Sequence, residues 1–98
     1  MSKLIIISKT CSKDLPLIQE LLKRDKENGL VLLSDAVFLL NDNKLIEDFQ
    51  ELFSSGRIFA LNVDIHKRDP ININLVNAIN YEELVDLLLK EKTSIVNL

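Results

Sequence analysis

Cys11 is the residue of this sequence best suited by type and position to covalent chemistry. It lies in a polar loop between Lys9 and Lys13, just before an expected helix. The positive end of a helix dipole and neighbouring lysines favour the thiolate, the form of cysteine that attacks or carries sulfur. The same position also suits a small, reduced and inert loop residue. The rate of Cys11 alkylation against pH distinguishes the two, because a thiol pKa at or above the ordinary ~8.5 excludes an activated thiolate.

Polar residues after the second and third apolar runs form the other candidate site: Asp35, Asn62, Asp64 and Arg68. Asp35 is a candidate functional carboxylate, although we favour a role as N-cap of a short helical turn over residues 36–40. Asp64 and Arg68 are four positions apart, a spacing at which two side chains form an ion pair on a surface turn. We expect these four residues to contribute to binding or to an interface.

Three large apolar residues, Phe38, Leu39 and Leu40, occupy the same short turn. A small α/β domain has little room to bury all of them, and a subunit interface would cover the remainder. Burial of all three in the monomer core is an equally good interpretation, since exposed apolar residues are common. Phe38 and Leu39 are therefore candidate interface residues.

The scarce residues exclude several classes of site. One cysteine and one histidine, His66, cannot form a disulfide or the usual His/Cys zinc site, so we expect no metal. Two glycines are too few for a GxGxxG or P-loop motif, and no cofactor is expected. His66 lies among charged residues and is interpreted as solvated; without a GxSxG motif, a Ser-His-Asp triad has no support. A net charge of −3 argues against direct binding of nucleic acid through the chain's own charge.

The length and composition favour one soluble domain spanning residues 1–98. The chain has 98 residues, 47% of them hydrophobic, which is enough for one core. No apolar run approaches the ~20 residues that span a bilayer, and the first residues lack a signal-peptide core. A single cysteine without a secretory signal favours the cytoplasm.

Apolar runs alternate with amphipathic segments along the whole chain. The runs predict strands over residues 3–8, 30–33, 58–61, 75–79 and 93–96. We expect a first helix that is capped by Asp14 and ends in the charged stretch 23–27, with a left-handed stop at Gly29. A second helix is expected over residues 45–53 with a stop at Gly56, and a third after a capping box at Asn80 and Glu83. Residues 62–70 are expected to be a polar connection. This alternation predicts a three-layer α/β/α sandwich with a five-stranded parallel sheet. In such a sheet the chemistry lies outside the carboxyl ends of the strands.

Three segments resemble the DsrH/TusB family of sulfur-relay proteins. Residues 32–37, LLSDAV, resemble the family's LLxQDGV segment. Residues 59–68, FALNVDIHKR, are similar to VYALxEDLxARG, and residues 80–87, NYEELVDL, are similar to DYxxFVxL. The segments occur in the family's order and at compatible spacing, and the likeness covers nearly the whole chain. Departures include Ser34 in place of glutamine and Ala36 in place of glycine.

The resemblance implies a DsrE/F/H-like fold and a place in a heterohexamer of three related subunits. Such assemblies pass persulfide sulfur toward 2-thiolation of the tRNA wobble uridine, or act in sulfur oxidation. Their essential sulfur-carrying cysteine belongs to the TusD-type subunit. DsrH-type cysteines lie inside the first helix, near Glu20 in this numbering, so the resemblance assigns no role to Cys11.

The expected function is that of a non-catalytic subunit of a cytoplasmic sulfur relay. Its partners would be DsrE/TusD-like and DsrF/TusC-like subunits, or further copies of itself, with no membrane involved. One alternative is a direct persulfide carrier working through Cys11. Another is a stand-alone homo-oligomeric module that binds a small ligand, because a fold does not fix a function.

Overall fold

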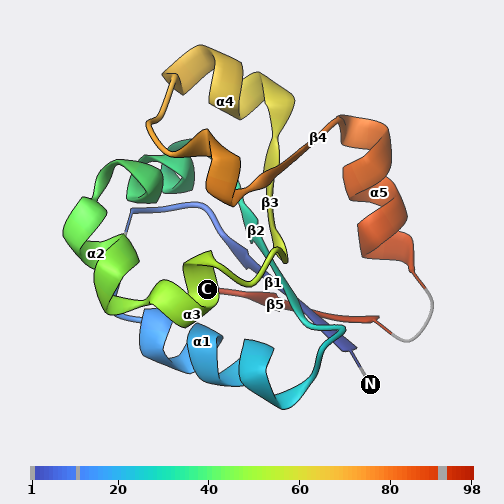
Figure 1. Ribbon diagram of the computed structural model, residues 1–98. Coiled ribbons are helices and arrows are strands. Elements are labelled where there is room, and N and C mark those ends of the chain that lie inside the picture. The colour runs from blue at the N-terminus through green and yellow to red at the C-terminus, as the bar shows by residue number, and fades with distance from the viewer. Residues whose placement is uncertain (1, 11, 91–92) are drawn as a thin grey trace.

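A five-stranded, all-parallel sheet forms the centre of the protein. The computed structural model describes residues 2–10, 12–90 and 93–98 (Figure 1). The strand order is β4-β3-β2-β1-β5, so β4 and β5 lie at the two edges. The strands are β1 (Ser2–Ile7), β2 (Gly29–Leu32), β3 (Ile58–Leu61), β4 (Asn77–Ile79) and β5 (Thr93–Asn97). The predicted α/β/α class and the parallel sheet are confirmed.

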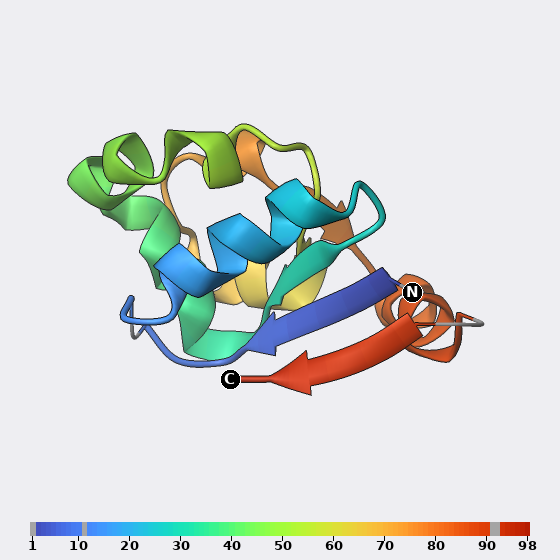
Figure 2. The same cartoon turned by 90° about the horizontal axis from the view of Figure 1, so that it is seen from below.

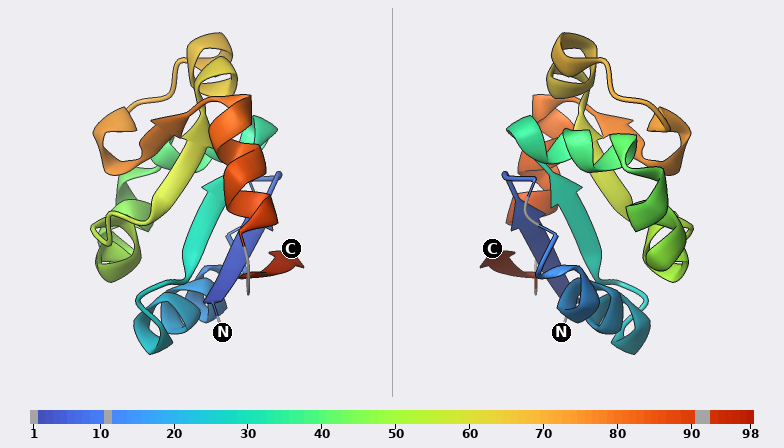
Figure 3. Two further views of the ribbon diagram at one scale, coloured as in Figure 1. Left: turned by 90° about the vertical axis from the view of Figure 1, so that its right-hand side faces the viewer. Right: turned by 90° about the vertical axis from the view of Figure 1, so that its left-hand side faces the viewer.

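Helices cover both faces of this sheet, as Figures 2 and 3 show. The elements of one face are α1 (Leu15–Arg24), the 3₁₀ helix η1 (Ser34–Asn41), α2 (Asn43–Asp48) and α3 (Gln50–Phe53). Helix α5 (Tyr81–Leu89) lies on the opposite face. Helix α4 (Asn62–Arg68) follows β3 directly, and a short 3₁₀ helix, η2 (Ile73–Leu75), precedes β4.

The aliphatic runs form strands because both of their faces are buried. The protein has two hydrophobic cores, one on each face of the sheet. Ile5 of β1 pairs with Leu30 of β2, and both side chains pack with Ile18 of α1 in the larger core. The adjacent residues Leu4 and Val31 face the smaller core beneath α5. Successive side chains of a strand point to opposite faces, so an unbroken aliphatic run is typical of a parallel sheet covered on both sides.

The start of α5 follows the expected capping box. The Glu83 N–H donates to Asn80 Oδ1 at 2.8 Å, and the Asn80 N–H donates to Glu83 Oε1 at 3.2 Å. The helix then turns Leu84 into the smaller core, with Leu87 and Leu88 packed against it. This pair of hydrogen bonds satisfies two of the N–H groups that a helix start leaves open.

The first helix ends in the charged stretch as expected, but the expected left-handed stop at Gly29 is wrong. Helix α1 ends at Arg24, and Gly29 is the buried first residue of β2. A Cβ atom at Gly29 would lie 3.3 Å from Cε2 of Phe59, so a larger residue here would make a tight contact with the aromatic ring of the neighbouring strand. Gly56, in contrast, does adopt the left-handed conformation, with φ of 74°. The expected helix over residues 45–53 is divided into α2 and α3 by a non-helical backbone at Phe49.

Residues 62–70 were expected to be a connection, but most of them form α4. The charge order of this segment suits a helix, with Asp64 in the first turn and three basic residues in the last: His66, Lys67 and Arg68. Acidic groups stabilise the positive start of a helix dipole and basic groups its negative end. The helix ends at Arg68, and the C-cap residue Asp69 takes a left-handed φ of 46°. The charge order was the sequence signal for α4.

An ion pair on the surface joins α1 to α3. Lys23 Nζ lies 2.9 Å from Glu51 Oε2, and both side chains are more than half exposed. The hydrogen bond and charge of Glu51 raise the pKa of Lys23 above its ordinary value. The stabilisation that this ion pair gives to the folded state is therefore present at neutral pH. It is lost only as the pH rises through the raised pKa of Lys23.

Candidate functional site

Four polar side chains meet at the carboxyl ends of β2 and β3: Ser34, Asp35, Asp64 and Arg68, here called the rim cluster. The guanidinium of Arg68 joins the other three. Its Nε donates to Asp35 Oδ1 at 3.0 Å, and its Nη1 donates to Asp64 Oδ1 at 3.2 Å. Its Nη2 donates to Ser34 Oγ at 3.1 Å. All three nitrogens of the guanidinium thus hold side chains from η1 and α4.

Ser34 has a backbone conformation that few residues other than glycine adopt. Its φ is 53°, in the left-handed region. Its N–H donates to Asp64 Oδ2 at 2.9 Å. One oxygen of the Asp64 carboxylate therefore binds Arg68, and the other binds the strained backbone at the start of η1. These contacts fix η1 to α4.

Burial differs sharply within the rim cluster. The side chains of Arg68 and Asp64 are 17% and 15% exposed, whereas that of Asp35 is 64% exposed. The Arg68–Asp64 pair is therefore screened from water more than an ordinary surface pair. Two carboxylates against one guanidinium leave the cluster with a formal charge of −1. The rim cluster accordingly presents the Asp35 carboxylate to solvent and does not favour an anionic ligand.

The predicted ion pair between Asp64 and Arg68 is confirmed, but the predicted capping role of Asp35 is wrong. Residue Leu33 occupies the N-cap position, η1 begins at Ser34, and the Asp35 carboxylate accepts from Arg68. Residues 35 and 68 are 33 positions apart, and their link has no signature in local spacing. The parallel sheet alone placed them at the same edge. The role of Ser34 was missed, because nothing in its sequence context indicates a positive φ.

The expected interface residues of η1 have different fates. Phe38 is 38% exposed, while Leu39 is 4% exposed and belongs to the larger core. Leu39 is therefore removed from the set of candidate interface residues. With three residues per turn of this 3₁₀ helix, residues 35, 38 and 41 face solvent and the residues between them, Leu39 and Leu40 included, face the core.

Asn62 lies at the start of α4, where its side chain is exposed. It borders an open hollow between α4 and η2. The hollow is lined by Asn62, Val63, Ile65, His66, Asp69 and Ile73. His66 is exposed on the last turn of α4, which agrees with its interpretation as a solvated residue.

Cys11 lies outside the residues that the structure describes, so its sulfur chemistry stays a prediction. Within residues 2–10, 12–90 and 93–98, no group of three or more His, Cys, Asp or Glu side chains is placed to hold a metal ion. Among the helices of that same part of the chain, none is long and apolar enough to cross a lipid bilayer.

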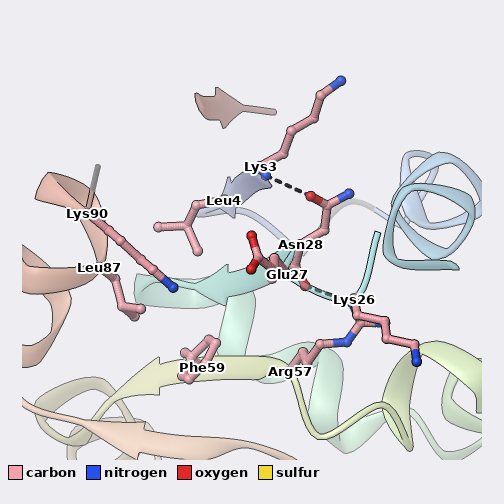
Figure 4. Close-up of a pocket in the computed structure, with 10 residues that line it drawn as sticks. Lys3, Leu4, Lys26, Glu27, Asn28, Arg57, Phe59, Leu87 and Lys90 are labelled. Carbon is pink, nitrogen blue, oxygen red and sulfur yellow. Dashed lines mark hydrogen bonds between the residues drawn. The ribbon is translucent and has the colours of Figure 1, made fainter. Parts of the chain in front are cut away.

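A second hollow, of about 160 Å³, lies at the opposite end of the sheet, where the strands begin (Figure 4). Its polar groups hold the fold together. Arg57 donates to three main-chain carbonyls, those of Leu22 at 2.6 Å, Asp25 at 2.7 Å and Asn28 at 3.0 Å. The Asn28 side chain accepts from the Lys3 N–H at 2.7 Å and donates to the Leu21 carbonyl at 2.7 Å. These bonds fasten the end of α1 and the residues before β2 to the starts of β1 and β3.

Comparison with known families identifies the chain. Residues 8–94 match the sequence profile of the family described as DsrH like protein. The chain belongs to the DsrH-like family. No curated protein and no solved structure matches the chain. DsrH-like membership supports a role of the sulfur-relay type, and proteins of this family work in complexes with DsrE- and DsrF-like partners.

Two substitutions of Ser34 test the strain in this DsrH-like protein. Ser34→Ala removes the hydroxyl that binds Arg68 but keeps a side chain at positive φ, so we expect a loss of about 1 kcal/mol. Ser34→Gly also loses the hydroxyl but relieves the strained backbone by about 1 kcal/mol, which brings it close to wild type. Urea unfolding of both variants measures the difference. Equal stabilities of the two variants would show that the left-handed backbone carries no strain.

Proposed function

We propose that this DsrH-like protein is a non-catalytic subunit of a cytoplasmic sulfur relay, acting in persulfide transfer for 2-thiolation of the tRNA wobble uridine. One observation carries the proposal: Arg68 binds Ser34, Asp35 and Asp64 with all three of its nitrogens. A cluster whose polar groups satisfy one another suits a rigid docking surface better than a reactive centre. Membership of the DsrH-like family supplies the class of pathway.

The outer surface of the rim cluster supports docking of a sister subunit. Phe38 and Asp35 are exposed neighbours in η1, and Asn62 is exposed at the start of α4. An aromatic side chain beside polar groups is a common anchor in protein interfaces. The hydrogen bonds of the rim cluster would hold this surface in one conformation before binding, which lowers the entropic cost of association.

Capture of sister subunits tests the docking surface. The chain is co-expressed with DsrE-like and DsrF-like subunits from the same cell, and the complex is isolated through a tag on the DsrE-like subunit. We expect Phe38→Asp to weaken capture by at least about tenfold, since it places a charge at an apolar anchor. Leu17→Asp is the matched control, because Leu17 is 53% exposed on α1. Equal capture of both variants, or recovery of self-associated chains alone, would contradict the proposal.

Sulfur loading tests the absence of a catalytic role. In a relay, the thiolate of the acceptor attacks the outer sulfur of the donor's persulfide, and the donor leaves as a thiolate. The sulfur changes partner and no external oxidant is required. With a cysteine desulfurase and cysteine, we expect the intact mass of this chain to stay unchanged while a sister subunit gains sulfur. A gain of one sulfur atom that Cys11→Ser abolishes would establish the alternative, a persulfide carrier.

A further inference from the structure

Strand β5 forms an unprotected edge of the sheet. The strand order ends at β5, which pairs with β1 alone, and Figure 2 shows no described element on its outer side. Edge strands are usually protected by charged side chains, proline, a bulge or short length. The segment Thr93–Asn97 contains neither charge nor proline, and its five residues pair with β1 in continuous register. The opposite edge strand, β4, has only three residues.

The backbone of β5 offers hydrogen-bonding groups on its outer side. The Leu98 N–H donates to the Ile6 carbonyl of β1 at 3.0 Å. In a parallel pair, alternate residues direct both main-chain groups to the same neighbour. The main-chain N–H and C=O groups of even-numbered residues in this segment therefore point to β1. Those of Ile95 and Asn97 point away from the sheet.

The side chain of Ile95 adds an apolar contact beside this edge. Ile95 pairs with Leu4, which belongs to the smaller core beneath α5. Helix α5 leaves Ile95 itself 44% exposed. The edge thus combines outward backbone groups with an exposed aliphatic side chain at the middle of the strand.

We propose that β5 is the contact surface for a second copy of this chain, paired antiparallel about a two-fold axis through Ile95. In that arrangement each Ile95 exchanges both main-chain hydrogen bonds with its counterpart, and residue 97 of one copy faces residue 93 of the other. The two Ile95 side chains lie side by side on the same face of a continuous sheet. A strand without charge meets its own copy without like-charge repulsion. The proposal is independent of the sulfur-relay function.

Introducing a charged side chain at position 95 tests the two-fold axis. Light scattering of the full chain at increasing concentration should give a dimer. Ile95→Lys and Ile95→Glu should each raise the dissociation constant at least tenfold, because like charges face each other. An equal mixture of the two variants should recover the dimer. Ile71→Lys is the control, because Ile71 is 62% exposed outside the sheet. A monomeric wild type, or a mixture that stays monomeric, would overturn the proposal.

Crosslinking provides a second measurement on folded protein. Directly paired residues of an antiparallel ladder lie about 5.5 Å apart at Cα, within the range for a disulfide. In a Cys11→Ser background, Ile95→Cys should form a covalent dimer under mild oxidation, whereas Ile71→Cys should not. Equal crosslinking of the two cysteines would also overturn the proposal.

Discussion

Replacing Arg68 by alanine is expected to lower the free energy of unfolding by about 2–3 kcal/mol. The guanidinium donates to Ser34, Asp35 and Asp64, and the Asp64 carboxylate is only 15% exposed. Without Arg68, that carboxylate stays partly buried beside a backbone N–H as its remaining partner. The loss is smaller than for a fully buried pair because water reaches part of the site. Urea unfolding should show a lower midpoint with an unchanged slope.

Two further variants separate the geometry of Arg68 from its charge. Arg68→Lys keeps the positive charge but lacks the planar group that spans three acceptors, so we expect an intermediate loss of about 1–2 kcal/mol. Arg24→Ala is the control, because Arg24 forms an exposed pair with Glu20 at 3.7 Å. Such a pair contributes less than about 0.5 kcal/mol. If Arg68→Ala costs no more than Arg24→Ala, the rim cluster does not hold η1 to α4.

Replacing Arg57 by alanine is expected to cost a similar amount, about 2–3 kcal/mol. Arg57 donates to the carbonyls of Leu22, Asp25 and Asn28, which lie at and beyond the end of α1. Its positive charge also favours the negative end of that helix. Urea unfolding measures the loss, with Lys26→Ala as a control from the same hollow. A cost equal to that of Lys26→Ala would show that water replaces Arg57 without penalty.

The two arginine variants also distinguish stability from function. Arg57 lies at the amino-terminal edge of the sheet, and the rim cluster lies at the carboxyl edge. At a temperature where both variants remain folded, we expect Arg68→Ala to weaken capture of sister subunits and Arg57→Ala to leave it unchanged. Equal capture by the two variants would show that the rim cluster does not contribute to docking.

The sequence by itself determined the sheet and the common edge of the site. Unbroken aliphatic runs such as residues 30–33 are typical of strands buried on both faces, as in a parallel sheet between helices. Parallel strands end at one edge, so Asp35 and Arg68 had to lie near each other once the strands were known. The capping box at Asn80 was also predictable, since it depends on residues three positions apart.

Only the tertiary structure decided what each of these residues does. The partner of Asp35 is 33 positions away, the N–H of the left-handed Ser34 binds the Asp64 carboxylate, and Gly29 packs closely against the Phe59 ring of a neighbouring strand. Local spacing determines which charged residues lie at the ends of a helix and which face of a single element is apolar. Contacts between elements depend on how those elements pack, and their energies are large enough to override the local preference of a residue such as Asp35 for a helix cap.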